Sequence, residues 1–313
     1  MTLTAAAPTD TMSDIGGAPS LRVVIDVMDA PKETRIALAR HPNIAPEVLI
    51  VLARDKDIEI RRAAASNPNI PPDVMMALMN TQDQETHLSI ATNPSAPQQV
   101  LARLFMVYVQ TPRYNAAHAD IDVSRETHQQ FQLALVRNPN TSLGILQELA
   151  TSNESNIKAG VARHPQVSTD ILVWLAHSPD IAVQYAAVEN PKLPSAALQM
   201  LSHSTHNPDI LRAISRHPQA GPDTLNWLTR QDDPVVRTNI IYNPNTPSDT
   251  ISVLLSAMED ANAKASLLHR PGVSRNLVMT LLADPKVRAV IANDTRIPAP
   301  IREAANRAVF SRQ

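Results

Sequence analysis

A His-Pro or Asn-Pro dipeptide recurs along this chain at a nearly constant interval. Successive prolines are separated by 26, 26, 45, 26, 26, 27 and 26 residues, and they stand at Pro42, Pro68, Pro94, Pro139, Pro165, Pro191, Pro218 and Pro244. A repeat length of about 20–50 residues is typical of solenoid proteins, whose units stack in a row and contact mainly their neighbours. The single long interval marks an insertion in the third repeat.

The apolar pattern inside each repeat is helical. When position 1 is set at Arg35, position 4 is apolar in every repeat, and the aliphatic positions 14, 15 and 18 have the spacing of one helix face. Position 18 is leucine in the first nine repeats: Leu52, Leu78, Leu104, Leu149, Leu175, Leu201, Leu228, Leu254 and Leu281. We therefore expect this row of leucines to form the core.

Each repeat is predicted to contain two short helices, one over positions 12–19 and one from position 24 to position 6 of the next repeat. Proline at position 11 or 12 suits the first turn of the first helix, where its missing N–H would have no partner. An acidic residue near the start of the second helix, as at Asp57 and Asp180, can cap it. Asn at position 7 is expected to close that helix in a left-handed turn before the proline.

These features together resemble the leucine-rich repeat variant family. The resemblance rests on Leu at position 18, Pro at position 11 or 12, and the motif Arg-x-Ala-apolar-Ala-x-Asn/His-Pro, and it covers about residues 35–310. It implies an all-α fold, a right-handed α-solenoid similar to HEAT and armadillo proteins, with about ten 26-residue repeats that each pair an α-helix with a 3₁₀ or short α-helix. One family member carries an iron–sulfur cluster on cysteines, but this chain has no cysteine.

The repeat also sets the expected domain organisation. Residues 1–19 are predicted to be a disordered tail and residues 20–313 one solenoid domain. That domain comprises an N-terminal cap over 20–34, nine repeats over 35–286 with an insertion near 105–131, and a degenerate repeat with a C-terminal cap over 287–313. The N-terminus lacks the regions of a secretory signal, and no apolar run is long enough to span a membrane, so we expect a cytoplasmic protein.

Composition argues against several classes of chemistry. The absence of cysteine excludes disulfides, iron–sulfur ligation and thiol catalysis. The six glycines form no phosphate-binding loop, and there is no metalloprotease helix or nucleophile elbow. We therefore expect no enzymatic activity, no cofactor or metal, and no small-molecule ligand. The net charge of −2 does not favour nucleic acid as a partner, although a local basic stripe would be compatible with it.

Such a stripe is the first candidate contact surface. Position 6 carries Arg40, Arg137, Arg163 and Arg216, and positions 1 and 2 carry further arginines and lysines. The same position of successive repeats lies on one line of a solenoid, so these side chains could contact an acidic partner or phosphates. The alternative is local pairing with Asp residues at positions 21–23, which would stabilise the fold only slightly.

The insertion is the second candidate. Residues 105–131 contain two of the four tyrosines and two of the three phenylalanines, and Tyr108, Arg113, Tyr114 and His118 are candidate partner contacts. Insertions in solenoids often lie on the binding face. Alternatively, the segment forms a longer helix that packs back through Phe105 and Phe131. Deleting residues 108–126 would restore the period, and we expect the fold to survive it. His118, Asp120 and Asp122 could also suggest a metal, although a solvated loop explains them as well.

The third candidate is a pair of tryptophans at position 17, Trp174 and Trp227. Two tryptophans on one line of a groove resemble the HEAT-like alkylpurine DNA glycosylases, where aromatic residues and an acid hold a damaged base. Here we identify no acid at a matching position beside them. The alternative is packing at the edge of the core, as Val51, Ala77 and Val253 at the same position suggest.

The histidines at position 7 are better explained as part of the fold than as ligands. His41, His164 and His217 alternate with Asn at that position, so the shared requirement is a polar residue before proline. The sequence as a whole therefore predicts a non-enzymatic scaffold or adaptor that binds a protein along its surface. The alternatives are a HEAT-like nucleic-acid-binding or DNA-repair module, and a structural subunit of a larger assembly.

Overall fold

The computed structural model describes residues 26–110, 124–255, 258–270 and 272–310, with the backbone alone for residues 308–310. The chain divides into two compact units, Met1–Ile145 and Leu146–Gln313. Over the described ranges all regular structure is helical, without a strand. The arginine, tyrosine and histidine at positions 113, 114 and 118, the carboxylates at 120 and 122, and the predicted tail over 1–19 all lie outside these residues.

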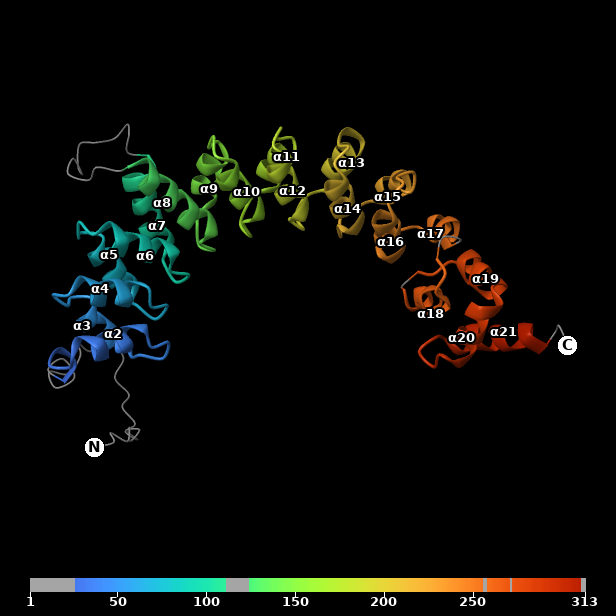
Figure 1. Cartoon of the computed structure of the whole chain (residues 1–313), viewed down its shortest axis with the longest axis horizontal. Helices are drawn as coiled ribbons and strands as arrows, with labels where there is room; N and C mark the ends of the chain where they lie inside the picture. The colour runs from blue at the N-terminus through green and yellow to red at the C-terminus, as the bar shows by residue number, and fades with distance from the viewer. Residues whose placement is uncertain (1–25, 111–123, 256–257, 271, 311–313) are drawn as a thin grey trace. The chain divides into compact units, whose positions relative to one another are not determined.

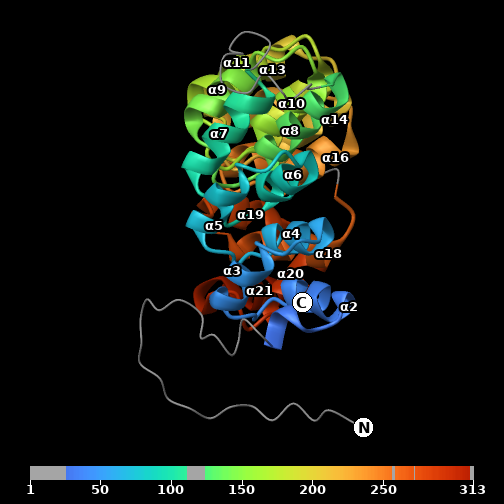
Figure 2. The same ribbon diagram turned by 90° about the vertical axis from the view of Figure 1, so that its left-hand side faces the viewer.

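The first unit begins with a helical turn at residues 26–28, continues with a series of helices, and ends in a helix that crosses into the second unit. These helices are α2 (Lys32–Arg40), α3 (Pro46–Leu52), α4 (Ile58–Ala65), α5 (Pro72–Leu78), α6 (Gln84–Thr92), α7 (Gln98–Tyr108), α8 (Arg125–Arg137) and the boundary helix α9 (Leu143–Ala150). Helix α2 packs on α4, α4 on α6, and α6 on α8. In this unit α2, α4 and α6 form one layer, and α3, α5 and α7 form the other (Figure 2).

The second unit continues the same alternation. Its described helices are α10 (Ser155–Arg163), α11 (Thr169–Ala176), α12 (Ile181–Glu189), α13 (Ser195–Ser204), α14 (Pro208–Arg216), α15 (Pro222–Leu228), α16 (Pro234–Tyr242), α17 (Ser248–Leu254), α18 (Ala261–Ser266), η2 (Leu267–His269), α19 (Arg275–Ala283), α20 (Pro285–Asn293) and α21 (Ala299–Phe310). Helices α10, α12, α14 and α16 pack in sequence, and α11 packs on α13 and α13 on α15 (Figure 1).

The predicted all-α solenoid of two-helix repeats is confirmed. In the second repeat, for example, α5 covers positions 12–18 and α6 begins at position 24. The first helix of each repeat is a short α-helix and not a 3₁₀ helix. Helices of seven to eleven residues exceed the length at which 3₁₀ geometry is usually maintained.

The row of leucines at position 18 forms the core, as predicted. All nine are buried, from Leu52 and Leu175 at 0% exposure to Leu254 at 7%. The second helix of each repeat contributes the apolar residue at position 4, such as Ile90, Leu135 and Ile214, all fully buried. Because each leucine contacts helices of its own and adjacent repeats, the core is continuous within each unit but thin.

The predicted acidic caps are present. The carboxylates of Asp57, Asp180 and Asp233 each accept a hydrogen bond from a backbone N–H in the first turn of the helix that follows. Asp83 accepts from the N–H of Thr86 in the same way. These side chains satisfy N–H groups that have no partner inside the helix.

The left-handed turn expected at position 7 is wrong. Asn93 has φ −73° and ψ 120°, which is extended, and no described residue other than glycine has positive φ. Proline at the next position favours this extended geometry. Asparagine is needed instead for its amide: Nδ2 of Asn93 donates to the carbonyl oxygens of Ala65 and Asn67 in the preceding repeat, at 2.8 and 2.9 Å.

The same inter-repeat bond recurs along both units, and we call it the position-7 ladder. The amides of Asn67, Asn138, Asn190 and Asn243 bind carbonyls of the preceding repeat in the same way. Nε2 of His217 does so with the carbonyl of Asn190 at 3.0 Å, and Arg270 with those of Ile241 and Asn243. Position 7 thus requires a side chain with an N–H group that can donate to a carbonyl oxygen of the preceding repeat.

The insertion is largely helical at both ends. Helices α7 and α8 are longer than their counterparts, and Phe105 and Phe131 are buried, which supports the interpretation that the segment packs back on the repeats. Tyr108 stacks on Phe131 with ring centroids 3.7 Å apart. Its hydroxyl lies 2.6 Å from Nδ1 of His87, whose Nε2 donates to the carbonyl of Leu78. Burial therefore raises the pKa of Tyr108 and keeps the phenol neutral.

Candidate partner-binding face

In the fifth to eighth repeats, which belong to the second unit, the side chains at position 17 form an exposed apolar row. Trp174 on α11, Met200 on α13 and Val253 on α17 are 54%, 52% and 73% exposed. Trp227 on α15 is half-buried, with its ring packed edge-on against His203 at a centroid distance of 4.6 Å. We call these four residues the position-17 row. Packing at the edge of the core, the alternative suggested by the sequence, is wrong for Trp174 and Val253.

Helix geometry explains why position 17 is exposed while its neighbour is not. Each residue of an α-helix is rotated by about 100° from the one before it. Position 18 points into the core, as the full burial of Leu175 and Leu228 shows, so position 17 lies at the side of the first helix. The fold does not require a large side chain there, because Ala77 occupies the same position in the first unit.

The first unit lacks an equivalent row. Its position-17 residues are Val51, which is buried at 8% exposure, the small Ala77, and Arg103, whose guanidinium donates to the side-chain oxygen of Asn80. The apolar row is therefore a property of the second unit. The repeats of the first unit fold without a large exposed apolar residue at position 17, so the fold itself does not require the apolar residues of the row.

Carboxylates accompany the row on one side. Asp170, Asp223 and Asp249 at position 13 are exposed, and each precedes a row residue by four positions. Residues four apart on a helix are neighbours, with Cβ atoms about 5–6 Å apart. The sequence-based statement that no acid lies beside the tryptophans is therefore wrong. Asp249 accepts a hydrogen bond from Asn276 at 3.2 Å, whereas Asp170 and Asp223 form no ion pair with any described residue.

The other side of the row carries no negative charge. Three residues after Trp174, Met200 and Trp227 stand His177, His203 and Arg230. The imidazoles of His177 and His203 donate from Nδ1 to carbonyls of their own helices, at 2.7 and 2.8 Å. The face thus has an apolar centre, an acidic edge and a neutral to basic edge.

The arginines at position 6 do not form a uniform basic stripe. Arg163 and Arg216 both approach the carboxylate of Glu189, at 3.6 Å each, and Arg216 also donates to the hydroxyl of Tyr185. A shallow pocket of about 530 Å³ adjoins this group and is lined by Arg163, Glu189 and Lys192 among others. Arg40 and Arg137 are exposed, and neither forms an ion pair within the part of the chain that the structure describes.

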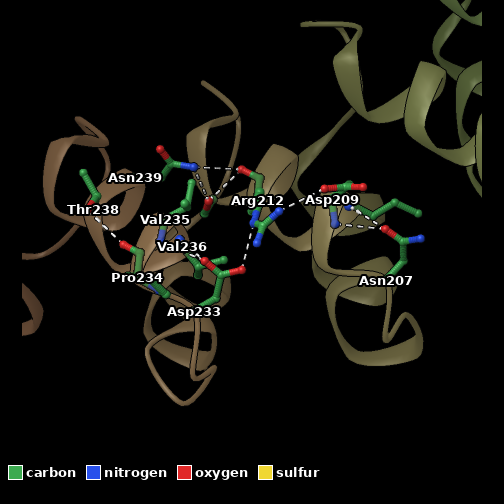
Figure 3. A network of polar contacts seen from close by, with 11 residues as sticks. Asn207, Asp209, Arg212, Asp233, Pro234, Val235, Val236, Thr238 and Asn239 are labelled. Carbon is green, nitrogen blue, oxygen red and sulfur yellow. Dashed lines mark hydrogen bonds and ion pairs between the residues drawn. The ribbon is translucent and has the colours of Figure 1, made fainter.

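Several of the basic residues at positions 1 and 2 pair locally. Arg62 binds Asp83 through two N–H groups, at 2.9 and 2.6 Å, and this pairing holds the pKa of the Asp83 carboxyl well below its usual range. Arg212 on α14 joins Asp209 on the same helix to Asp233 at the N-terminus of α16, at 3.1 and 2.8 Å (Figure 3). Lys264 binds Asp284 at 3.1 Å. These pairs join α4 to α6, α14 to α16 and α18 to α20, so they stabilise the stack and are not left open to a partner.

Tyr108 is not available as a partner contact, because it is fully buried between His87 and Phe131. Because Tyr108 is aromatic and lies in the insertion, the sequence suggested a contact with a partner. In the structure its ring instead packs the insertion against the repeats. Among the described residues there is no cluster of His, Asp or Glu that could hold a metal ion. No described helix is both long and apolar enough to cross a lipid bilayer.

Comparison with known proteins gives similarity in fold alone. No family model matches the chain, and no curated protein matches it. Among solved structures it resembles a leucine-rich repeat variant with a repetitive structural motif, at 17% identity and a TM-score of 0.48, over 91% of this chain and 100% of that one. An engineered protein matches at 15% identity and a TM-score of 0.34, over 92% and 97%. This chain is an all-helical repeat protein, and over most of its length it matches a leucine-rich repeat variant.

Proposed function

We propose that this chain is a non-enzymatic scaffold that binds a protein partner through the position-17 row of its second unit. The observation that supports this most is the exposure of Trp174, at 54%, beside Met200 at 52%. Large apolar side chains gathered on one face mark interaction sites, and tryptophan is among the residues that contribute most to binding free energy.

The face suits a protein better than a nucleic acid. One edge of the row carries the carboxylates of Asp170 and Asp223, which repel phosphates, and Arg230 is the one arginine or lysine that we place on the other edge. Arg163 and Arg216 lie on the second helices of their repeats and are already close to Glu189. Aromatic side chains without a basic surface beside them do not favour a DNA-repair role for this face.

Affinity capture with matched variants tests this proposal. The Trp174→Ser/Met200→Ser variant removes two exposed apolar side chains of the row. The Ile181→Ser/Val235→Ser variant removes two that are similarly exposed, at 55% and 46%, but stand on α12 and α16 in the other layer. Circular dichroism should show both variants folded, because none of the four side chains is buried.

The partner captured by the wild type should be lost by the Trp174→Ser/Met200→Ser variant and retained by the Ile181→Ser/Val235→Ser variant. Mass spectrometry of the captured proteins identifies it. Retention of every captured protein by the first variant would contradict the proposal. Salt-sensitive capture of duplex DNA that depends on Arg163 and Arg216 would instead favour the nucleic-acid alternative.

A further inference from the structure

The chemistry of the partner follows from the two parallel rows of the second unit. Because this inference specifies the partner, it rests on the proposed function. We propose that the partner segment is a basic amphipathic helix, with apolar side chains that cover the position-17 row and lysines or arginines along one flank that face Asp170 and Asp223.

The first step concerns spacing. Helix α11 packs on α13, and α13 packs on α15, so Trp174, Met200 and Trp227 stand on three adjoining helices. Packed helices lie about 8–10 Å apart, so the three side chains project at intervals of about that length. An α-helix rises about 1.5 Å per residue, so residues seven apart are separated by about 10.5 Å on nearly the same face. A partner helix that lies along the row, with an apolar residue at every seventh position, thus places one apolar side chain against each repeat.

The second step concerns charge. Asp170 and Asp223 lie one helical turn from Trp174 and Trp227, so their line runs beside the apolar row at about 5–6 Å. Several other acidic residues of the unit have structural roles: Asp180 and Asp233 cap helices, and Glu189 lies near two arginines. Asp170 and Asp223 neither cap a helix through a recorded hydrogen bond nor form an ion pair with a described residue. Their carboxylates are therefore available to a partner along this edge of the row, and the exposed Glu148 at position 17 of the preceding repeat adds a negative charge at one end of it.

The third step concerns orientation. The opposite edge of the row carries His177, His203 and Arg230, so negative charge borders the row on one side only. A partner helix with lysines on one flank therefore forms ion pairs with Asp170 and Asp223 in only one orientation. Acidic residues on that flank would be repelled by the same two carboxylates. Complementary charges at the rim of an apolar contact mainly set orientation and association rate.

Two probe peptides test this inference directly. Each is a 21-residue helical peptide, labelled with fluorescein, with leucine at every seventh position and at the position four residues after it. One carries lysine along a single flank of the leucines, and the other carries glutamate at those positions. Fluorescence anisotropy measures the binding of each to the full-length chain.

The lysine peptide should bind the wild type at least about tenfold more tightly than the glutamate peptide, since opposite charges are replaced by like charges at two sites. The Asp170→Lys/Asp223→Lys variant should reverse that preference. The matched control is Glu47→Lys/Asp73→Lys, which changes two exposed acids at position 13 of the first unit and should leave the preference unchanged.

The outcomes separate this inference from the proposed function. If both peptides bind the wild type equally, and neither binds the Trp174→Ser/Met200→Ser variant, the face binds helices without selecting for basic residues. That result overturns the inference, while the proposed function stands. If neither peptide binds, the inference is also overturned, and the affinity capture decides the proposed function separately. Preference for the glutamate peptide by the wild type would overturn the inference outright.

Discussion

The side-chain amide of Asn93 lies 2.9 Å from the main-chain carbonyl oxygen of Asn67, the residue at the same position of the preceding repeat. The Oδ1 atom of Asn93 also accepts a hydrogen bond from the N–H of Ser95 at 2.9 Å. One buried side chain thus holds its own turn and the neighbouring repeat together. This explains why a polar residue, Asn or His, recurs directly before the proline of the first eight repeats rather than an apolar one.

Replacing a ladder amide should destabilise the stack. Asn93→Ala leaves the carbonyl of Ala65 without this partner and removes one of the two hydrogen bonds to the carbonyl of Asn67, so the free energy of unfolding should fall by about 1–3 kcal/mol. Urea unfolding followed by circular dichroism measures this. Asn93→His is the control, because histidine occupies the same position at His217 and donates to the equivalent carbonyl. An Asn93→Ala variant as stable as wild type would refute the role of the ladder.

His217 should make stability depend on pH. Burial lowers the pKa of His217 below its usual value, an effect opposed in part by its hydrogen bond to the carbonyl of Asn190. The unfolded chain therefore binds the proton first as the pH falls through about 6.5, and stability should decrease there until the folded protein is protonated too. His217→Asn, which restores the commoner ladder residue, should show a smaller loss between pH 7.5 and pH 5.5 in thermal unfolding. An identical loss in both proteins would contradict this.

Truncating two adjacent side chains of α11 should change the stability of the protein by very different amounts. Leu175 is fully buried, so Leu175→Ala should lower the free energy of unfolding by about 2–5 kcal/mol. Trp174 is more than half exposed, and Trp174→Ala should change stability by less than about 0.5 kcal/mol. Thermal unfolding of both variants measures the difference. Equal destabilisation would show that Trp174 belongs to the core and is not free to bind a partner.

The N-terminal end of the insertion should be needed for the stability of the fold, because Tyr108 is buried there. Deleting residues 108–126 would remove Tyr108, which packs between His87 and Phe131, so we expect this deletion to destabilise the fold, contrary to the prediction from the sequence alone. Tyr108→Ala should cost about 3–5 kcal/mol, as for other large aromatic residues, and Tyr108→Phe about 0.5–1.5 kcal/mol for the lost hydrogen bond to His87. Chemical unfolding of the two variants measures these values. A stable Tyr108→Ala variant would return the aromatic residue to the list of candidate contacts.

The repeat architecture could be predicted from the sequence because its signals are periodic. The leucine at position 18 and the proline near position 12 recur often enough to fix the helix boundaries, and the structure confirms them at α5 and α6. The role of Asn93 could not be predicted in the same way. Its amide bonds to residues about one repeat back, and local turn preferences give no information about such a partner.

The exposed face was harder to predict, because exposure depends on how neighbouring helices pack. Val51 and Trp174 share position 17, yet one is buried and the other is exposed, so position alone does not decide. The carboxylate of Asp170 could have been recognised as the neighbour of Trp174 from its helical spacing of four residues. Helical spacing also relates Asp223 to Trp227, and this signal was present in the sequence.

Site-specific photocrosslinking tests the central claim, that the position-17 row is the partner-binding face, most directly. A benzophenone side chain at position 200, in place of Met200 on α13, and a second one at position 181, in place of Ile181 on α12, sample two exposed positions in different layers. The partner identified by affinity capture should crosslink from position 200 and not from position 181. Crosslinking from position 181 with none from position 200 would contradict the claim.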